Sequence, residues 1–255
     1  MRLPASRLLP FALALALGTV AVNASASEVP AYVKAAAADP ARAGDLATDA
    51  RRHGADLVAF SEAKPGSSVL ELIPGGGYFT RLFSKTVGAK GHVYLAWPNQ
   101  YAGEARSDVE NSQALAKSKD FGNVEVLVQP AEALAVPHPV DVVFTSQNYH
   151  DYNDKFMAPA TVDTLNRQVF AALKPGGTWI IVDHVAEAGS GMRDTDTLHR
   201  IDPAIVRKQV EAAGFTYVGE SKVLRNPADG LKVKVFDKTI RGHTDQFAYK
   251  FRKPK

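Results

Sequence analysis

A dense group of polar and ionisable residues follows one apolar run of this sequence. Residues 140–145 are mostly apolar, and they are followed by Ser146, Gln147, Asn148, Tyr149, His150 and Asp151. A histidine beside an aspartate is a suitable general base, because the ordinary pKa of imidazole lies near neutral pH. We therefore predict a catalytic group of His150, Asp151 and Tyr149 that takes a proton from a substrate. The alternative is a structural turn that holds a half-buried histidine.

A glycine loop forms the second candidate site. The apolar run 69–73 contains Glu71, and it is followed by Pro74, Gly75, Gly76 and Gly77 and then by a segment with helical spacing, 78–87. Glycines have no Cβ, so a ligand could lie directly against this main chain. A strand, a glycine loop and a helix start form the place where α/β sheets present backbone N–H groups to a ligand. Alternatively, Glu71 is a charged surface residue at the end of the strand and does not bind a ligand.

The elements that must position these residues alternate along the chain. Apolar runs at 92–96, 124–128, 140–145 and 178–182 predict strands, and 105–118 and 161–173 predict helices. This alternation predicts an α/β protein with a parallel sheet and helices on both faces. Extended segments at 215–224 and 231–236 flank a turn cluster and predict a C-terminal antiparallel hairpin. Residues 27–64 predict an Ala-rich helical extension, with Asp39 and Pro40 as N-cap and first helical residue.

The glycine loop resembles motif I of the class I S-adenosylmethionine (SAM)-dependent methyltransferases, V-L-D/E-L-G-x-G-x-G. Glu71 aligns with the acid of the motif, Gly75 and Gly77 with its second and third glycines, and Ile73 replaces the first. The resemblance covers residues 64–236 and is closest to exported bacterial predicted methyltransferases with a P-G-G-G loop and an N-Y-H-D segment. It implies a Rossmann-like, mostly parallel seven-stranded sheet closed by the hairpin, in one domain over residues 65–255.

The resemblance also implies a cofactor site for SAM. Glu71, Pro74, Gly75, Gly76 and Gly77 would hold the methionine part, and Asn148 would contact the cofactor from the next strand end. Trp97 occupies the position of the family's usual ribose-binding acid and could stack on the purine. Glu132 could meet the adenine amine. The implied activity is methyl transfer to a small molecule or an envelope component. The alternative, favoured by the missing acid, is an exported non-catalytic ligand-binding protein with the same fold.

Histidines and acids at two neighbouring strand ends raise the question of a metal. The strands 140–145 and 178–182 are adjacent in the family's sheet order, so His150, Asp151, Asp183 and His184 could approach one another. Two histidines would suit Zn²⁺ or Mn²⁺. The sequence has no compact ligand motif, so we predict no metal site. Farther on, His199 and Arg200, together with Arg193, could clamp a substrate carboxylate or phosphate, or could equally be surface residues.

The N-terminal residues predict export. Arg2 and Arg7, the apolar run 8–22 and Ala24-Ser25-Ala26 form a secretory signal peptide over residues 1–26, with an uncleaved anchor as the alternative. We therefore expect a periplasmic or secreted protein without a stable membrane span after cleavage. The net charge of +3 includes two signal-peptide arginines, so the body is nearly neutral, and we expect no nucleic-acid partner. The basic residues after 249 predict a solvated terminus. The chain has no cysteine, which excludes a disulfide framework.

Overall fold

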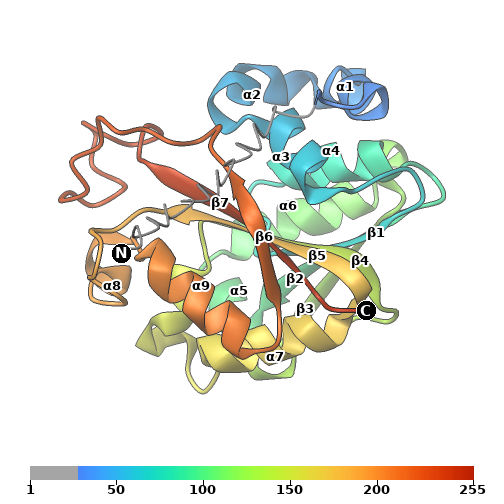
Figure 1. Ribbon diagram of the computed structural model, residues 1–255. Coiled ribbons are helices and arrows are strands. Elements are labelled where there is room, and N and C mark those ends of the chain that lie inside the picture. Colours follow the sequence, from blue (N-terminus) through green and yellow to red (C-terminus); the bar gives the residue numbers. More distant parts are fainter. Residues whose placement is uncertain (1–27) are drawn as a thin grey trace, which may run out of the picture.

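The computed structural model describes residues 28–255 and shows a central sheet with helices on both faces (Figure 1). The predicted signal peptide lies outside the described residues. The sheet has seven strands in the order β3-β2-β1-β4-β5-β7-β6. The strands are β1 Ser68–Leu72, β2 His92–Pro98, β3 Val124–Gln129, β4 Val140–Ser146, β5 Leu173–His184, β6 Thr216–Ser221 and β7 Gln246–Arg252. Strands β1 to β5 are parallel, and β7 runs antiparallel to both β5 and β6. This confirms the predicted Rossmann-like class I methyltransferase fold.

Two apolar layers join the helices to the sheet. On one face, α1 Ala31–Ala37, α3 Gly54–Ser61 and α4 Tyr78–Val87 pack through residues such as Leu57 and Phe83 against Phe144 of β4. On the other face, α7 Val162–Ala172 and α9 Pro203–Ala212 pack against Trp179 of β5. The remaining helices are α2 Leu46–Arg52, α5 Asn99–Ala102, α6 Arg106–Ala116 and α8 Thr195–Leu198. None of the helices that the structure describes is long and apolar enough to cross a membrane.

The segment before β1 is helical, as predicted, and it is packed onto the sheet. The side chain of Asp39 accepts a hydrogen bond from the Ala41 N–H at the start of a 3₁₀ turn, with Pro40 in the first position. At the other end of the segment, Thr178 of β5 donates to the Ser61 carbonyl. Glu62 pairs with Arg252 of β7 at 2.8 Å. These contacts fix the end of α3 beside β5 and β7.

The predicted C-terminal antiparallel pair of strands is present, but its second strand lies later in the chain than predicted. Strand β6 pairs with β7 at residues 246–252, and residues 231–236 lie in the long connection between the two strands. The difference follows from burial: Phe247, Ala248 and Phe251 of β7 are fully buried, whereas only Val235 is buried among residues 231–236. The predicted solvated terminus is wrong for the same reason, since β7 includes two of its four basic residues.

Candidate functional site

A cavity of about 270 Å³ lies under the glycine loop between β1 and α4. The loop, the ends of β2 and β4, α5, α6 and the last residue of α2 form its walls. Of the predicted cofactor residues, those that line the cavity are Glu71, Pro74, Gly75, Gly76, Trp97 and Asn148. Gly77 lies behind the loop, where Arg81 covers its Cα, and Glu132 is exposed beside Gln100. The structure thus brings six of the eight predicted residues to one cavity.

The loop turns by left-handed backbone conformations at three of its residues. Gly75 and Gly77 have φ values of 54° and 75°, which glycine adopts without strain. Ile73, at the position where the motif usually has glycine, also has a positive φ of 49°. This conformation is unfavourable for a β-branched residue, so contacts around it must hold it in place. The Asn148 side-chain amide supplies two of them by donating to the carbonyls of Leu72 and Ile73 at 3.2 and 3.1 Å.

Glu71 is an ionisable group that burial has made easy to protonate. Its side chain is 3% exposed and accepts a hydrogen bond from the Thr80 hydroxyl at 2.6 Å. Burial raises the pKa of Glu71 to about 8, although the Thr80 hydroxyl and the charges of Arg52 and Arg81 oppose the rise. A cation entering the cavity beside Glu71 would favour the carboxylate form.

Arg52 is a cavity residue that the sequence did not reveal. It is the last residue of α2, and its guanidinium lies 4.8 Å from the centre of the Phe79 ring and donates to Ser146 Oγ at 3.0 Å. No local pattern distinguishes it from Arg51, because only the packing of α2 against α4 directs one of the two arginines inward. The cavity therefore has a carboxyl group and a guanidinium in its walls, a combination that can receive the ammonium and the carboxylate of an amino acid.

The opposite end of the cavity differs from the prediction. The Trp97 side chain is fully buried and its indole N–H donates to Ser112 Oγ at 3.2 Å, so it forms the cavity floor. Asp108, in the first turn of α6, also lines the cavity. It supplies a carboxylate near the position where the sequence lacks one at the end of β2. Sequence reasoning missed it because α6 begins eight residues after the end of β2.

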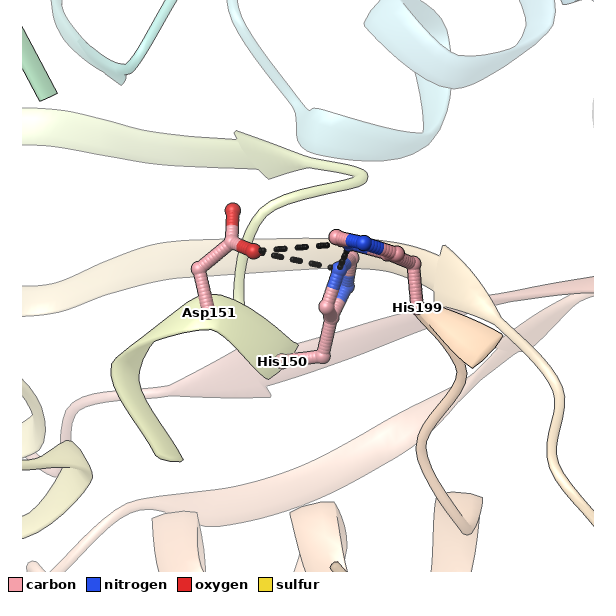
Figure 2. A group of neighbouring side chains, drawn as sticks. All are labelled: His150, Asp151 and His199. Atoms are coloured by element: carbon pink, nitrogen blue, oxygen red, sulfur yellow. Dashed lines mark hydrogen bonds and ion pairs between the residues drawn. The ribbon is translucent and has the colours of Figure 1, made fainter. Parts of the chain in front are cut away.

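A second group of side chains lies beside the cavity, where His150, Asp151 and His199 point toward one another (Figure 2). His150 and Asp151 belong to the short turn after β4, and His199 ends α8 in a left-handed conformation. His150 Nε2 lies 3.2 Å from both Asp151 Oδ1 and His199 Nδ1. The Tyr101 hydroxyl, which lines the cavity, donates to Asp151 Oδ2 at 3.0 Å and so joins the two sites.

The expected near-neutral pKa of His150 is wrong. Burial disfavours its protonation, but the carboxylates of Asp183 and Asp151 outweigh burial and raise the pKa of His150 to about 10. Asp183 Oδ1 lies 2.8 Å from His150 Nδ1. An imidazole held as a cation cannot take a proton, so His150 is no general base in this state. Burial and the neighbouring His150 instead lower the pKa of His199, which sequence reasoning placed outside the catalytic group.

Tyr149 and the remaining predicted residues lie apart from this group. Tyr149 is fully buried in the core, and its hydroxyl bonds with Asn166, against the predicted catalytic position. His184 faces Thr244, with its Nδ1 2.7 Å from the Thr244 hydroxyl. Arg200 is fully buried and pairs with Asp229, so it cannot clamp a substrate. Arg193 is an exposed residue that pairs with its neighbour Asp194.

Comparisons with curated proteins find methyltransferases. The chain is 30% identical over 182 residues to the ubiquinone/menaquinone biosynthesis C-methyltransferase UbiE of Vibrio cholerae, a match of 68% of this chain and 63% of that protein. It is 28% identical over 190 residues to the protein of the same name from Shewanella oneidensis, with 71% and 68% covered. The chain thus spans less than two thirds of the first relative. No family model matches the sequence.

Solved structures share the fold at low sequence identity. A SAM dependent methyltransferase from Aquifex aeolicus matches with a TM-score of 0.56 and 19% identity over 84% of this chain and 93% of its own. The glycopeptide N-methyltransferase MtfA, complexed with sinefungin, matches with a TM-score of 0.55 and 15% identity over 81% and 87%. The [4+2]-cyclase SpnF matches with a TM-score of 0.60 and 16% identity over 80% of each chain. The fold alone therefore accompanies more than one kind of reaction.

Proposed function

We propose that this chain is an exported enzyme of the class I SAM-dependent methyltransferase superfamily. It binds SAM and transfers the methyl group to a small molecule or an envelope component. The observation that carries the proposal is the cavity under the glycine loop, with the carboxyl group of Glu71 and the guanidinium of Arg52 in its walls. SAM has an amino-acid end and a sulfonium that makes its methyl group electrophilic.

Each wall of the cavity fits one part of this cofactor. Glu71 would accept hydrogen bonds from the ammonium group, and Arg52 would donate to the carboxylate. Gly76 leaves open space on its Cα, where no atom lies within 4 Å of the position that a Cβ would take, so the main chain is accessible to the ligand. Asp108 would accept hydrogen bonds from the ribose hydroxyls, in place of the acid that the end of β2 lacks. Trp97 closes the floor of the cavity.

The acceptor lies on the side of His150, Asp151 and His199. Tyr101 connects this group to the cavity through its hydrogen bond to Asp151. An acceptor with an O–H or N–H must lose a proton in the reaction. His199, which is half-buried and has a lowered pKa, is the neutral imidazole of the group and is able to take that proton. His150 and Asp183 hold the group in place.

The proposed location rests on the N-terminal sequence alone. The basic residues Arg2 and Arg7, the apolar run 8–22 and the A-x-A signal before Ser27 support export and cleavage. N-terminal sequencing of the protein recovered from the periplasm should begin at or near Ser27. Recovery of the chain with Met1 intact from the membrane fraction would contradict the proposal.

Calorimetric titration with SAM and its demethylated product tests the cofactor. We expect micromolar binding of both by the wild type and binding weakened at least tenfold in Arg52→Gln, with Arg51→Gln as the matched control. Transfer of a labelled methyl group from SAM to a component of an envelope or small-molecule extract then tests the activity. Binding without any transfer would favour the non-catalytic ligand-binding protein, and absence of binding would remove the cofactor assignment.

A further inference from the structure

Three potential metal-ligand atoms from two distant parts of the chain converge beside the cavity (Figure 2). They are His150 Nε2, Asp151 Oδ1 and His199 Nδ1, and all three lie within 4.8 Å of one another. His150 is separated from Asp151 Oδ1 and from His199 Nδ1 by 3.2 Å, and His199 Nδ1 is 4.0 Å from Asp151 Oδ1. His184, the neighbour that the sequence suggested as a second histidine, takes no part.

Two of these separations are close to the edge length of a coordination tetrahedron, and the third is longer. Zinc binds histidine nitrogen and carboxylate oxygen at about 2.1 Å, so two ligand atoms of a tetrahedral site lie about 3.4 Å apart. The three observed separations lie on both sides of this value. A small movement of the half-buried His199 ring would shorten the 4.0 Å separation between His199 Nδ1 and Asp151 Oδ1 to the expected value.

Neighbouring residues hydrogen-bond to His150 and Asp151 and orient them, as residues that hydrogen-bond to metal ligands commonly do. Asp183 Oδ1 lies 2.8 Å from His150 Nδ1, and the backbone N–H groups of His150 and His184 hold the Asp183 carboxylate in position. A metal ion would displace the Nε2 proton that His150 carries in the metal-free protein, while the Nδ1 proton would stay directed at Asp183. Tyr101 holds the second oxygen of Asp151. A histidine that donates its other ring nitrogen to a carboxylate is the usual arrangement in metal sites.

One ligand of the group is partly exposed to solvent. The His150 and Asp151 side chains are 3% exposed, whereas the His199 side chain is 24% exposed. Phe236 packs against one side of the His199 ring, with the ring centres 4.9 Å apart. An ion held by the three buried or half-buried ligands would therefore keep a position for water or for a substrate oxygen.

We propose that His150, Asp151 and His199 bind one first-row divalent transition metal ion such as Zn²⁺. Two imidazole nitrogens and one carboxylate oxygen suit Zn²⁺ or Mn²⁺ better than Mg²⁺ or Ca²⁺, which prefer oxygen ligands. The inference goes beyond methyl transfer, because it gives His199 another role. With an ion bound, His199 Nδ1 would be a ligand, and His199 would serve as the proton acceptor only in the metal-free protein. An ion at this place would act as a Lewis acid on an acceptor oxygen bound at the open position.

Metal titration without SAM tests the site on the full chain purified without a polyhistidine tag. After chelator treatment and dialysis, we expect one equivalent of Zn²⁺ by calorimetry and by elemental analysis. Co²⁺ in place of Zn²⁺ should give the intense visible absorption of a four-coordinate site. His199→Gln removes a ligand and should weaken Zn²⁺ binding by at least about 100-fold. Asp183→Asn changes a residue that hydrogen-bonds to a ligand and should weaken Zn²⁺ binding by about 10–100-fold. His138→Gln, an exposed histidine elsewhere, is the matched control.

Thermal unfolding of the metal-free proteins separates loss of ligand from loss of fold. His199→Gln replaces a half-buried side chain and should unfold at nearly the wild-type temperature without Zn²⁺, while the wild type alone gains stability when Zn²⁺ is added. Equal Zn²⁺ affinity in the wild type and in His199→Gln would overturn the proposal, as would less than one equivalent bound by the wild type. Because SAM is absent throughout, neither result bears on methyl transfer.

Discussion

Binding of SAM should release a proton from Glu71. The buried carboxyl group has a pKa of about 8 in the free protein, so about 90% of it is protonated at pH 7. The ammonium group of the bound cofactor would stabilise the carboxylate and lower that pKa. If the bound form is fully ionised, about 0.9 proton leaves per SAM bound at pH 7. The association constant should then rise about tenfold between pH 6 and pH 7.

Calorimetry in buffers with different ionisation enthalpies measures this proton directly. The observed binding enthalpy changes with the ionisation enthalpy of the buffer, and the slope gives the number of protons released. Measurements at pH 6–7.5 keep the α-amino group of SAM mostly charged, since such groups titrate near 7.7–8.0. The matched variant Glu71→Gln keeps the shape of the side chain and removes the titrating group. It should release almost no proton and should show a flat pH dependence of affinity over this range.

The raised pKa of Glu71 also makes the free energy of unfolding depend on pH. A carboxyl group whose pKa is raised on folding stabilises the folded state below its ordinary pKa of 4.5, and that stability is lost as the pH rises through about 8. The wild type should therefore lose up to a few kcal/mol relative to Glu71→Gln between pH 5 and pH 9 in the absence of ligand. Equal proton release by both proteins, or an unfolding difference that does not change with pH, would refute the assignment of the raised pKa to Glu71.

Three further variants test the cavity and its surroundings. Gly76→Leu should abolish SAM binding, because the added side chain enters the open space of the cavity, and it should leave the unfolding temperature unchanged. The control is Gly122→Leu, whose added side chain also meets no atom within 4 Å of the Cβ position; this variant should bind SAM normally. Arg52→Gln should weaken SAM binding by about 1.5–3 kcal/mol in a titration, and the exposed neighbour in Arg51→Gln should have little effect. Asp229→Asn should destabilise the fold by about 3–5 kcal/mol in chemical denaturation, because it leaves a fully buried guanidinium without its counter-charge; a loss below 1 kcal/mol would contradict that account.

Most of the fold could be predicted from the sequence, because local apolar runs mark most of its strands. The predicted ranges at 92–96, 124–128 and 140–145 lie within β2, β3 and β4, and the predicted helix at 78–87 is α4. The last strand could not be predicted, since β7 combines basic side chains with buried apolar ones at a chain end. Its identity depends on pairing between β5 and β6, which no local pattern reveals.

The candidate site could be predicted only in part, because some of its residues come from distant elements. Glu71 and the glycine loop are contiguous in sequence, and they lie together in the cavity. Arg52 and His199 reach the site through the packing of α2 and α8, so their roles became visible only in three dimensions. The sequence predicts that Asp183 could approach His150, but it does not reveal the buried 2.8 Å contact between them that raises the pKa of His150.

The position of β7 also dictates the order in which the sheet can be completed. Among the strands of residues 28–255, β6 pairs only with β7, and β7 lies between β6 and β5. Until residues 246–252 have left the ribosome, the hydrogen-bonding edge of β5 stays open and β6 has no partner. Open strand edges bind other chains, so the nascent protein should be a good substrate for chaperones over this interval. Completion of the sheet is thus coupled to the synthesis of β7, and a ribosome stalled before β7 would display an aggregation-prone intermediate.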